Sequence, residues 1–184
     1  MRRLLACCLV LSCSVPVFAL FNPKIRNFEQ TGIEQRRVVS AYCRLDFQGA
    51  RLSPEGWERI GPLTTFRENP EFNSFFIVSR YQLIENPKPT DELDVAYVVI
   101  GRYEDGAGYM PMPASVKNVT FEMRDQKDEL RISHIDTPTP FVSRAAALAW
   151  LKSKLAMQKD AAGRAPIEGA IRALEAPPNP QHAP

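Results

Sequence analysis

His134 and Asp136 are two residues whose types and spacing could support acid–base chemistry. They follow Leu130 and Ile132 at alternate positions of the segment RISHIDTPTP, so on a β-strand all four side chains would share one face. A histidine titrates near neutral pH, and a carboxylate in apolar surroundings has a raised pKa that suits a general base. Asp46, at the end of a predicted helix, is the third candidate. In the alternative, both residues have purely structural roles: Asp136 caps the following turn, and His134 forms a hydrogen bond with a neighbouring backbone group or carboxylate.

Aromatic and arginine side chains supply the candidates for ligand binding. The predicted ligand-binding residues are Tyr42, Trp57, Arg80, Arg102 and His134. Arg80 and Arg102 lie in otherwise apolar strand segments and could hold a carboxylate ligand bidentately. More often an arginine in such a strand pairs with a cross-strand acid, here Glu104, with its stem on the sheet.

A pair of methionines in the segment Met110-Pro111-Met112-Pro113 could bind Cu(I), because thioethers are soft ligands. There is one such pair and no methionine-rich or histidine-rich tract, and the prolines equally suit a strand edge or loop. The sequence also lacks a Ser-His-Asp spacing, HExxH, CxxC, a P-loop and GxGxxG. We therefore predict no metal and no cofactor.

The N-terminal segment MRRLLACCLVLSCSVPVFA has the sequence pattern of a secretory signal peptide. Two arginines precede an apolar run too short to span a membrane, and Val17-Phe18-Ala19 forms a small-residue cleavage site. We predict that residues 1–19 are a signal peptide and that the protein is exported, to the bacterial periplasm or outside the cell. In the alternative, Val10-Leu11-Ser12-Cys13 resembles a lipobox and Cys13 is lipidated. No later stretch predicts a transmembrane helix.

Charge and cysteine content narrow the possible partners. Removing residues 1–19 removes two of the 23 basic residues, leaving 21 against 21 acidic ones, so the mature chain is formally neutral. A neutral chain without a basic cluster is a poor match for nucleic acid. Of the four cysteines only Cys43 survives cleavage, which excludes an internal disulfide and predicts a buried thiol.

Helical periodicity and cap residues predict two helices at the start of the domain. The apolar stripe of residues 33–47 predicts a helix that ends before Gly49. Ser53-Pro54-Glu55 then provides an N-cap, a first-turn proline and an acid, and starts a short helix that ends at Ile60. A third helix, residues 144–156, follows the cap Ser143. The segment 158–184 is predicted to be a flexible tail with at most two turns of helix.

Four strands are predicted between these helices, over residues 75–84, 95–103, 116–123 and 130–135. Short links, including residues 104–113, favour antiparallel neighbours. A hairpin tip at Gln126-Lys127 would place Phe121 opposite Ile132 and Val119 opposite His134, so His134 is expected to face inward.

This order of elements resembles the nuclear-transport-factor-like superfamily, the cystatin-like α+β roll, over residues 33–136. The helix in VVSAYCRLDFQG, the glycine after it and the second helix carry the resemblance, whereas the C-terminal helix departs from it. The resemblance implies a curved sheet that wraps the first helix into a cone, with a mainly apolar pocket at its open end. The superfamily includes ketosteroid isomerase, scytalone dehydratase, epoxide hydrolases and many non-enzymatic binding modules.

The predicted fold is therefore α+β: two N-terminal helices packed on a curved four-stranded antiparallel sheet, then a C-terminal helix. Residues 20–32 form an extension before the roll domain at 33–157. We predict an exported, non-catalytic binding module for a small apolar ligand, another protein or a second copy of itself. The alternatives are a small lyase or isomerase using His134 with Asp136 or Asp46, and a lipid-anchored envelope assembly factor.

Overall fold

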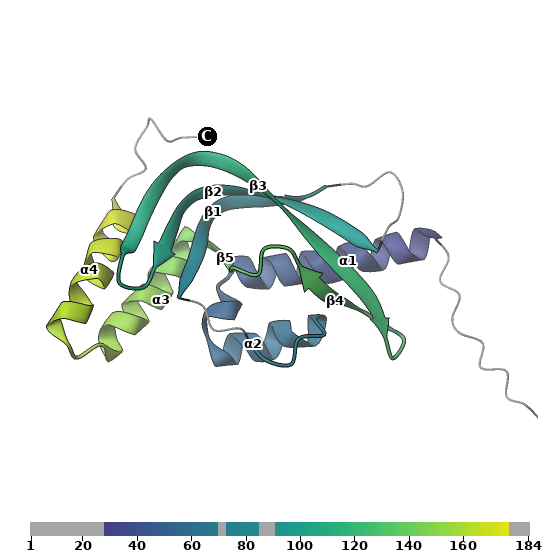
Figure 1. Ribbon diagram of the computed structural model, residues 1–184, viewed down its shortest axis with the longest axis horizontal. Helices are drawn as coiled ribbons and strands as arrows, with labels where there is room; N and C mark the ends of the chain where they lie inside the picture. The colour runs from purple at the N-terminus through teal and green to yellow at the C-terminus, as the bar shows by residue number, and fades with distance from the viewer. Residues whose placement is uncertain (1–27, 70–72, 85–90, 177–184) are drawn as a thin grey trace, which may run out of the picture.

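The computed structural model describes residues 28–69, 73–84 and 91–176 (Figure 1). The predicted leader, the alternative lipidation site at Cys13 and the last part of the predicted tail lie outside these residues. The described chain forms four α-helices and a five-stranded mixed sheet, which confirms the α+β class. The elements are α1 (Phe28–Phe47), α2 (Pro54–Ile60), β1 (Ser74–Leu83), β2 (Glu92–Glu104), β3 (Gly108–Gln126), β4 (Glu129–Ile135), β5 (Phe141–Ser143), α3 (Arg144–Met157) and α4 (Ala161–Glu175), with 3-10 turns η1 (Ala50–Leu52) and η2 (Gly61–Leu63) flanking α2.

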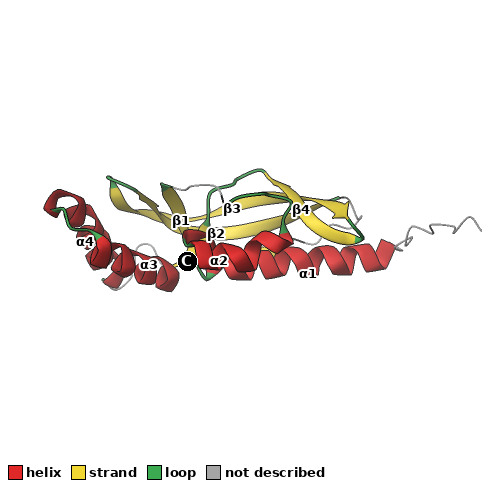
Figure 2. Ribbon diagram, turned by 90° about the horizontal axis from the view of Figure 1, so that it is seen from below, coloured by secondary structure: helices red, strands yellow, loops and turns green. Residues whose placement is uncertain are grey.

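The strands are arranged in the order β4-β3-β2-β1-β5. The predicted four strands correspond to β1–β4 and are antiparallel to their neighbours, but β5 adds a fifth strand that runs parallel to β1. The prediction of a four-stranded antiparallel sheet is therefore wrong in this detail, because three residues after a proline-rich turn are too few to show a strand period. The long strands arch over α1 and α2 (Figure 1), and these two helices lie along one face of the sheet (Figure 2).

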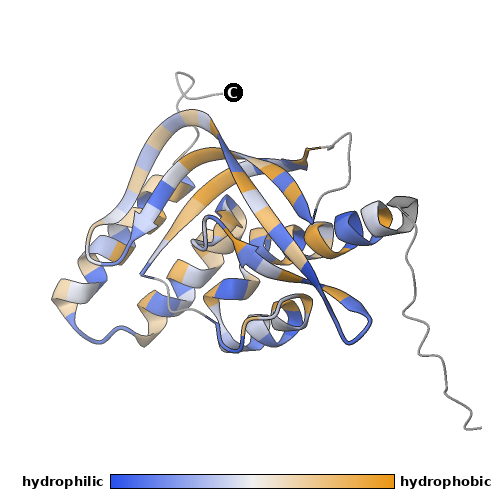
Figure 3. Ribbon diagram, turned by 45° about the vertical axis from the view of Figure 1, so that its right-hand side comes forward, coloured by the Kyte–Doolittle hydropathy of each residue, from blue (hydrophilic) through white to orange (hydrophobic). Residues whose placement is uncertain are grey.

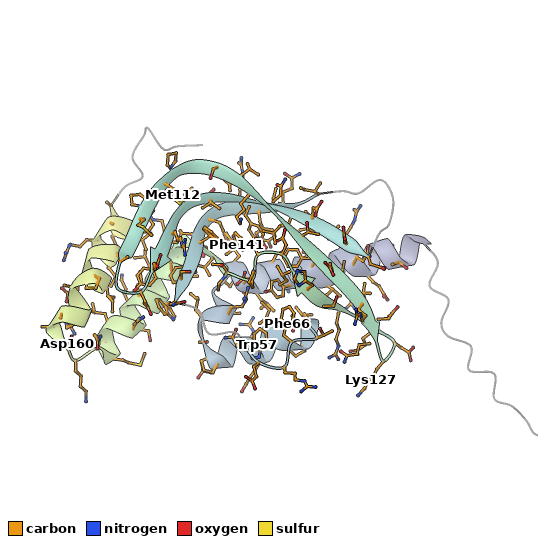
Figure 4. The ribbon with its side chains drawn as sticks, in the orientation of Figure 1. Trp57, Phe66, Met112, Lys127, Phe141 and Asp160 are labelled. Carbon is orange, nitrogen blue, oxygen red and sulfur yellow. The ribbon has the colours of Figure 1, made fainter. Side chains whose placement is uncertain are left out.

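A first hydrophobic core fills the space between α1 and the sheet. The Tyr42 and Phe121 rings meet edge to face with their centroids 5.5 Å apart, and Tyr97 stacks on Phe141 at 4.2 Å. All four aromatic side chains are at most 2% exposed, and Phe141 lies beneath the arch of the strands (Figure 4). Aromatic side chains thus fill the space between α1 and the sheet at these positions.

A second core lies between the sheet and the helices α3 and α4. Ile77 belongs to this core and the next residue, Val78, to the first. Because successive residues of a strand point to opposite faces, the two cores lie on opposite faces of β1. Hydrophilic residues gather at the β3–β4 turn and in the loop between α3 and α4 (Figure 3).

Helix α4 occupies most of the segment predicted to be a flexible tail. It has 15 residues rather than the two turns expected, begins at an Asp160 cap that accepts from Gly163 N at 2.8 Å, and buries Ile167 and Leu174. Arg144 of α3 donates to the Leu174 carbonyl at 2.6 Å and to the Ala176 carbonyl. Packing against α3 and the sheet therefore stabilises a helix whose Ala, Gly and Pro content alone gives a weak signal.

The β2–β3 hairpin is longer than predicted. Residues 108–113, expected to belong to a link, form the start of β3, and only residues 105–107 make the turn. Pro113 lies in a β-bulge, where Ile100 is opposite residues 112–114 of β3, and Pro111 pairs with Gly101 beside this bulge.

The register of the β3–β4 hairpin corrects the predicted orientation of His134. The tip is Lys127-Asp128, both with positive φ as in a two-residue type I′ turn, so Met123 pairs with Ile132. A bulge at Ser133 then places His134 opposite Glu122, and its side chain is exposed. Because the bulge reverses the alternation, Ile135 takes the inward position that the sequence pattern gives to His134.

Candidate functional site

A cavity of about 950 Å³ opens between α2 and α3. Its volume lies near the upper end of the roughly 300–1,000 Å³ typical of small-molecule sites. The chain has two tryptophans, Trp57 and Trp150, and both line this cavity, which we call the tryptophan cleft. In the described part of the chain its lining residues are Arg51, Leu52, Ser53, Pro54, Trp57, Glu58, Asn69, Asn73, Asp105 and Trp150.

Local sequence signals hold α2 where it forms one wall of the cleft. Ser53 caps the helix by accepting from Gly56 N at 3.1 Å, and Pro54 occupies the first turn, as predicted. Gly56 allows the helix to pack closely on η1, because a Cβ atom there would lie 2.1 Å from the Ala50 carbonyl oxygen. The next residue, Trp57, is thereby fixed at the edge of the cleft.

Trp57 stands between the tryptophan cleft and a smaller cavity of about 430 Å³. Phe66 and Arg131 line that smaller cavity. Phe66 lies beside α2, the helix that carries Trp57 (Figure 4). The Trp57 indole is half-buried, and its Nε1–H donates to no residue in the described ranges. Since an indole N–H normally finds a partner, this donor is available to a ligand.

Trp150, by contrast, is held on several sides. Its Nε1–H donates to the Leu52 carbonyl at 3.0 Å, which joins α3 to η1 across the cleft wall. Its ring meets Phe75 and Tyr103 edge to face at 5.4 and 5.7 Å, and the Lys154 ammonium lies 4.7 Å from its centroid. Trp150 therefore forms a rigid wall connected to the second core.

Asp105 occupies the β2–β3 turn at the rim of the cleft. Its carboxylate accepts hydrogen bonds from Lys154 Nζ and, at 3.1 Å, from the Tyr103 hydroxyl. Its backbone N–H donates to the Asn73 carbonyl at 2.8 Å. Burial, together with the Asp105 charge, raises the pKa of Tyr103, which therefore remains a neutral donor. Lys154 compensates the Asp105 charge.

A buried ionic pair lies behind the cleft. Arg51 and Asp46 are 3% and 1% exposed, with Arg51 Nη1 3.9 Å from Asp46 Oδ2. Arg51 also donates to the Pro138 carbonyl, and its own carbonyl accepts from Asn69 Nδ2 at 3.1 Å. The Arg51 guanidinium lies 5.8 Å from the Tyr42 ring centroid. Arg51 thus links η1 to the segment that enters β5.

Asp46 makes a second link to the same segment, because its Oδ2 accepts from Phe141 N at 3.0 Å. Burial raises the pKa of Asp46 to about 6, although the nearby Arg51 charge and the Phe141 N–H both oppose this rise. Its Oδ1 is buried without a hydrogen-bond partner among the described residues. These contacts indicate that Asp46 holds β5 against α1.

Cys43 is buried, as the sequence predicts. The Tyr97 hydroxyl donates to its Sγ at 3.1 Å, and burial raises the pKa of the thiol to about 12. The Cys43 side chain is therefore a neutral thiol at physiological pH rather than a nucleophilic thiolate.

The structure does not bring the predicted acid–base residues together. His134 and Asp136 are exposed, whereas Asp46 is buried beneath β5. Within the described ranges, no hydrogen bond or ion pair joins any two of these three residues. Their catalytic roles stay predictions, without the shared pocket that the chemistry requires.

The predicted ligand-binding residues are also dispersed. Tyr42 is in the first core, and Arg80 is exposed on the outer face of the sheet. Arg102 donates to Ser74 Oγ at 3.2 Å and lies 3.6 Å from Glu104, the acid considered as its structural partner. Of the five candidates, Trp57 is the one that lines the tryptophan cleft.

Sequence reasoning missed most of the cleft. Trp150 could have been noticed, because it lies off the stripe of Leu148, Leu151 and Leu155 on its helix and so needs another environment. Asn69, Asn73 and Asp105 gave no such signal, since polar residues in turns are ordinary.

No protein-family model, curated protein or solved structure matches the chain. Among the described residues, no helix has the length and apolar character needed to cross a membrane, and no three His, Cys, Asp or Glu side chains group as metal ligands. A functional interpretation therefore depends on the geometry of the cleft.

Proposed function

We propose that the protein is a non-catalytic binding module whose ligand occupies the tryptophan cleft. The observation that carries this proposal is that both tryptophans line one open cavity, and that the Trp57 indole N–H has no partner among the described residues. A concave site with aromatic walls and a few polar groups is the usual form of a small-molecule site. The ligand would thus lie beside α2, between this helix and α3.

The chemistry of the lining favours binding over catalysis. Neither histidine nor cysteine lines the cleft in the described part of the chain, and the Asp105 carboxylate is already bonded to Lys154 and Tyr103. Glu58 alone would have to act as acid or base. The lyase or isomerase alternative has less support, because its residues, His134, Asp136 and Asp46, are divided between solvent and core. Export through the predicted leader, and a homodimer or protein partner, stay predictions.

A matched pair of substitutions tests the proposed location. Asn73→Trp places a large side chain in the cleft, whereas Asn118→Trp adds the same side chain to an exposed position on the outer face of the sheet. Thermal-shift screening of a small-molecule library should find compounds that raise the melting temperature of the unaltered protein and of Asn118→Trp, but not of Asn73→Trp. Compounds that stabilise all three proteins equally would contradict the proposed site.

A further inference from the structure

The charge balance and the hydrogen-bonding groups of the tryptophan cleft indicate the chemical class of its ligand. We infer that the ligand is a neutral oligosaccharide, and this inference rests on the proposed function. Three observations carry this inference: the lining has little net charge, several donors and acceptors on it are unused, and a half-buried indole stands at its edge.

The ion pairs around the cleft leave little charge for a ligand. Arg51 faces Asp46, and Asp105 is paired with Lys154. Glu58 is the one lining carboxylate without an ion pair in the described ranges, and it is exposed. An anionic ligand would meet no uncompensated cation among these lining residues, so phosphate or carboxylate recognition is disfavoured. A neutral ligand avoids the desolvation cost of a charge.

Unused polar groups are placed along the same cavity. The Glu58 carboxylate is an acceptor and the Asn73 side-chain amide supplies both functions, while the Trp57 indole N–H is a donor that lies beside Gly61, at the edge shared with the smaller cavity. None of the three side chains has a hydrogen-bond partner among the described residues. A purely apolar ligand would leave such groups desolvated and unpaired, which is costly. Sugar hydroxyls both donate and accept, and so can satisfy all three.

The aromatic walls suit the other surface of a sugar. A pyranose ring presents C–H groups on its faces and hydroxyls at its rim, so it can pack on an indole while its hydroxyls bond to neighbouring side chains. The Trp57 ring makes no ring–ring or cation–π contact within the described ranges, whereas the face of Trp150 already meets Lys154. Trp57 is therefore the expected stacking platform. The volume of about 950 Å³ accommodates more than one sugar ring.

Calorimetric titration of the full chain tests this inference. The probes are cellotetraose, maltotetraose, mannotetraose and chitotetraose, with a sulfated heparin tetrasaccharide and choline as anionic and cationic comparisons. We expect saturable submillimolar binding of at least one neutral tetrasaccharide and none of the charged probes. Trp57→Ala should weaken that binding about tenfold or more, and Asn73→Ala about threefold or more, as expected for contacts of an anchor and a rim residue.

Control variants separate ligand contact from structural damage. Phe66→Leu alters the aromatic residue of the neighbouring cavity and should change the affinity by less than about twofold. Glu58→Gln removes the unpaired charge but keeps an acceptor, so sugar binding should survive it, whereas binding that depends on a cationic ligand should not. Glu58 and Asn73 are exposed, so these variants keep the test valid if Trp57→Ala fails to fold.

The outcomes distinguish this inference from the proposed function. If no neutral oligosaccharide binds, but other compounds bind in a way that Asn73→Trp abolishes, the inference is overturned and the binding function stands. The inference is likewise overturned if choline or the heparin fragment binds more tightly than every neutral sugar. If no compound of any class binds in a way that depends on the cleft, both are overturned.

Discussion

The two hydrophobic cores differ in how they hold their elements together. Four polar or charged residues are buried in the described part of the chain, namely Gln35, Asp46, Arg51 and Thr64. Two of them, Asp46 and Arg51, contact aromatic members of the first core, Phe141 and Tyr42. In the first core, Arg51 and Asp46 hold the entry to β5 through hydrogen bonds. In the second core, apolar packing holds α3 and α4 together, and the polar contacts between the two helices, such as the Lys152–Glu175 ion pair, lie at the surface or are only partly buried. The buried ionic pair thus fixes the position of β5, a short strand that packing alone would leave weakly specified.

The tryptophan cleft lies where these two regions meet. Arg51 and Trp57 reach it from the side of the first core, and Asp105 and Trp150 from the side of the second. The hydrogen bond from Trp150 to the Leu52 carbonyl joins the two sides. The walls of the proposed site are thus positioned by both kinds of interaction.

The largest expected effect comes from breaking the buried pair. Arg51→Met leaves Asp46 without its counter-charge and should destabilise the protein at pH 7 by about 3–5 kcal/mol. Urea unfolding measures this change. The loss should be smaller at pH 5, where Asp46 is protonated in the folded state, and adding Asp46→Asn should recover part of it. A cost below about 1 kcal/mol at pH 7 would show that the ionic pair does not hold the first core.

In the second core, Leu151→Ala should cost about 2–5 kcal/mol, because the side chain is fully buried and its removal leaves a cavity. The same urea experiment should give equal costs at pH 5 and pH 7, since the ionisable side chain among the buried members of this core is Tyr103, whose pKa is raised above its ordinary value of 10, so it is neutral at both pH values. The half-buried Leu148→Ala is the matched control and should cost less. If the cost of Leu151→Ala differed clearly between pH 5 and pH 7, the proposed difference between the two cores would be contradicted.

Titration of Asp46 should make stability depend on pH. Its pKa rises from 3.8 to about 6 on folding, so the folded protein holds this proton more tightly than the unfolded chain. The stability from this proton is present below about pH 4 and is lost as the pH rises to about 6, by at most about 3 kcal/mol. Asp46→Asn should therefore reduce the fall in unfolding free energy between pH 4 and 6. An unchanged slope would place the Asp46 pKa near its ordinary value.

The smallest expected effect belongs to the Tyr97–Cys43 hydrogen bond. Tyr97→Phe keeps the ring stacked on Phe141 but removes the hydroxyl that donates to Cys43 Sγ. The expected cost is about 1 kcal/mol, measured by thermal or urea unfolding. A cost as large as that of Leu151→Ala would mean that this polar contact matters more to the first core than its packing does.

Local signals predicted the elements well. Gly49, the Ser53-Pro54 pair and Ser143 marked the ends of helices correctly, because cap and first-turn preferences depend on neighbouring residues alone. The features that failed depend on contacts distant in sequence. The bulge at Ser133 turned His134 outward, β5 formed beside β1, and α4 is stabilised by packing against α3.

The candidate site was predicted only in part for the same reason. Trp57 was identified as an aromatic residue on a short helix, but its role depends on Trp150, which is 93 positions further along the chain. The buried pair shows the same effect, since Asp46 was considered as a catalytic residue without its partner Arg51. Residue types were readable from the sequence, whereas their juxtaposition is a product of the tertiary fold.

The most direct test of the cleft as a binding site uses the two indole N–H signals in the NMR spectrum of isotope-labelled protein, one for each tryptophan. The neutral tetrasaccharides and any compounds that stabilise the protein are titrated in turn. We predict a saturable shift of the Trp57 signal, with a smaller shift for Trp150, whose N–H is bonded to Leu52. A compound that binds and shifts backbone amide signals while both indole signals stay in place would contradict the proposed site.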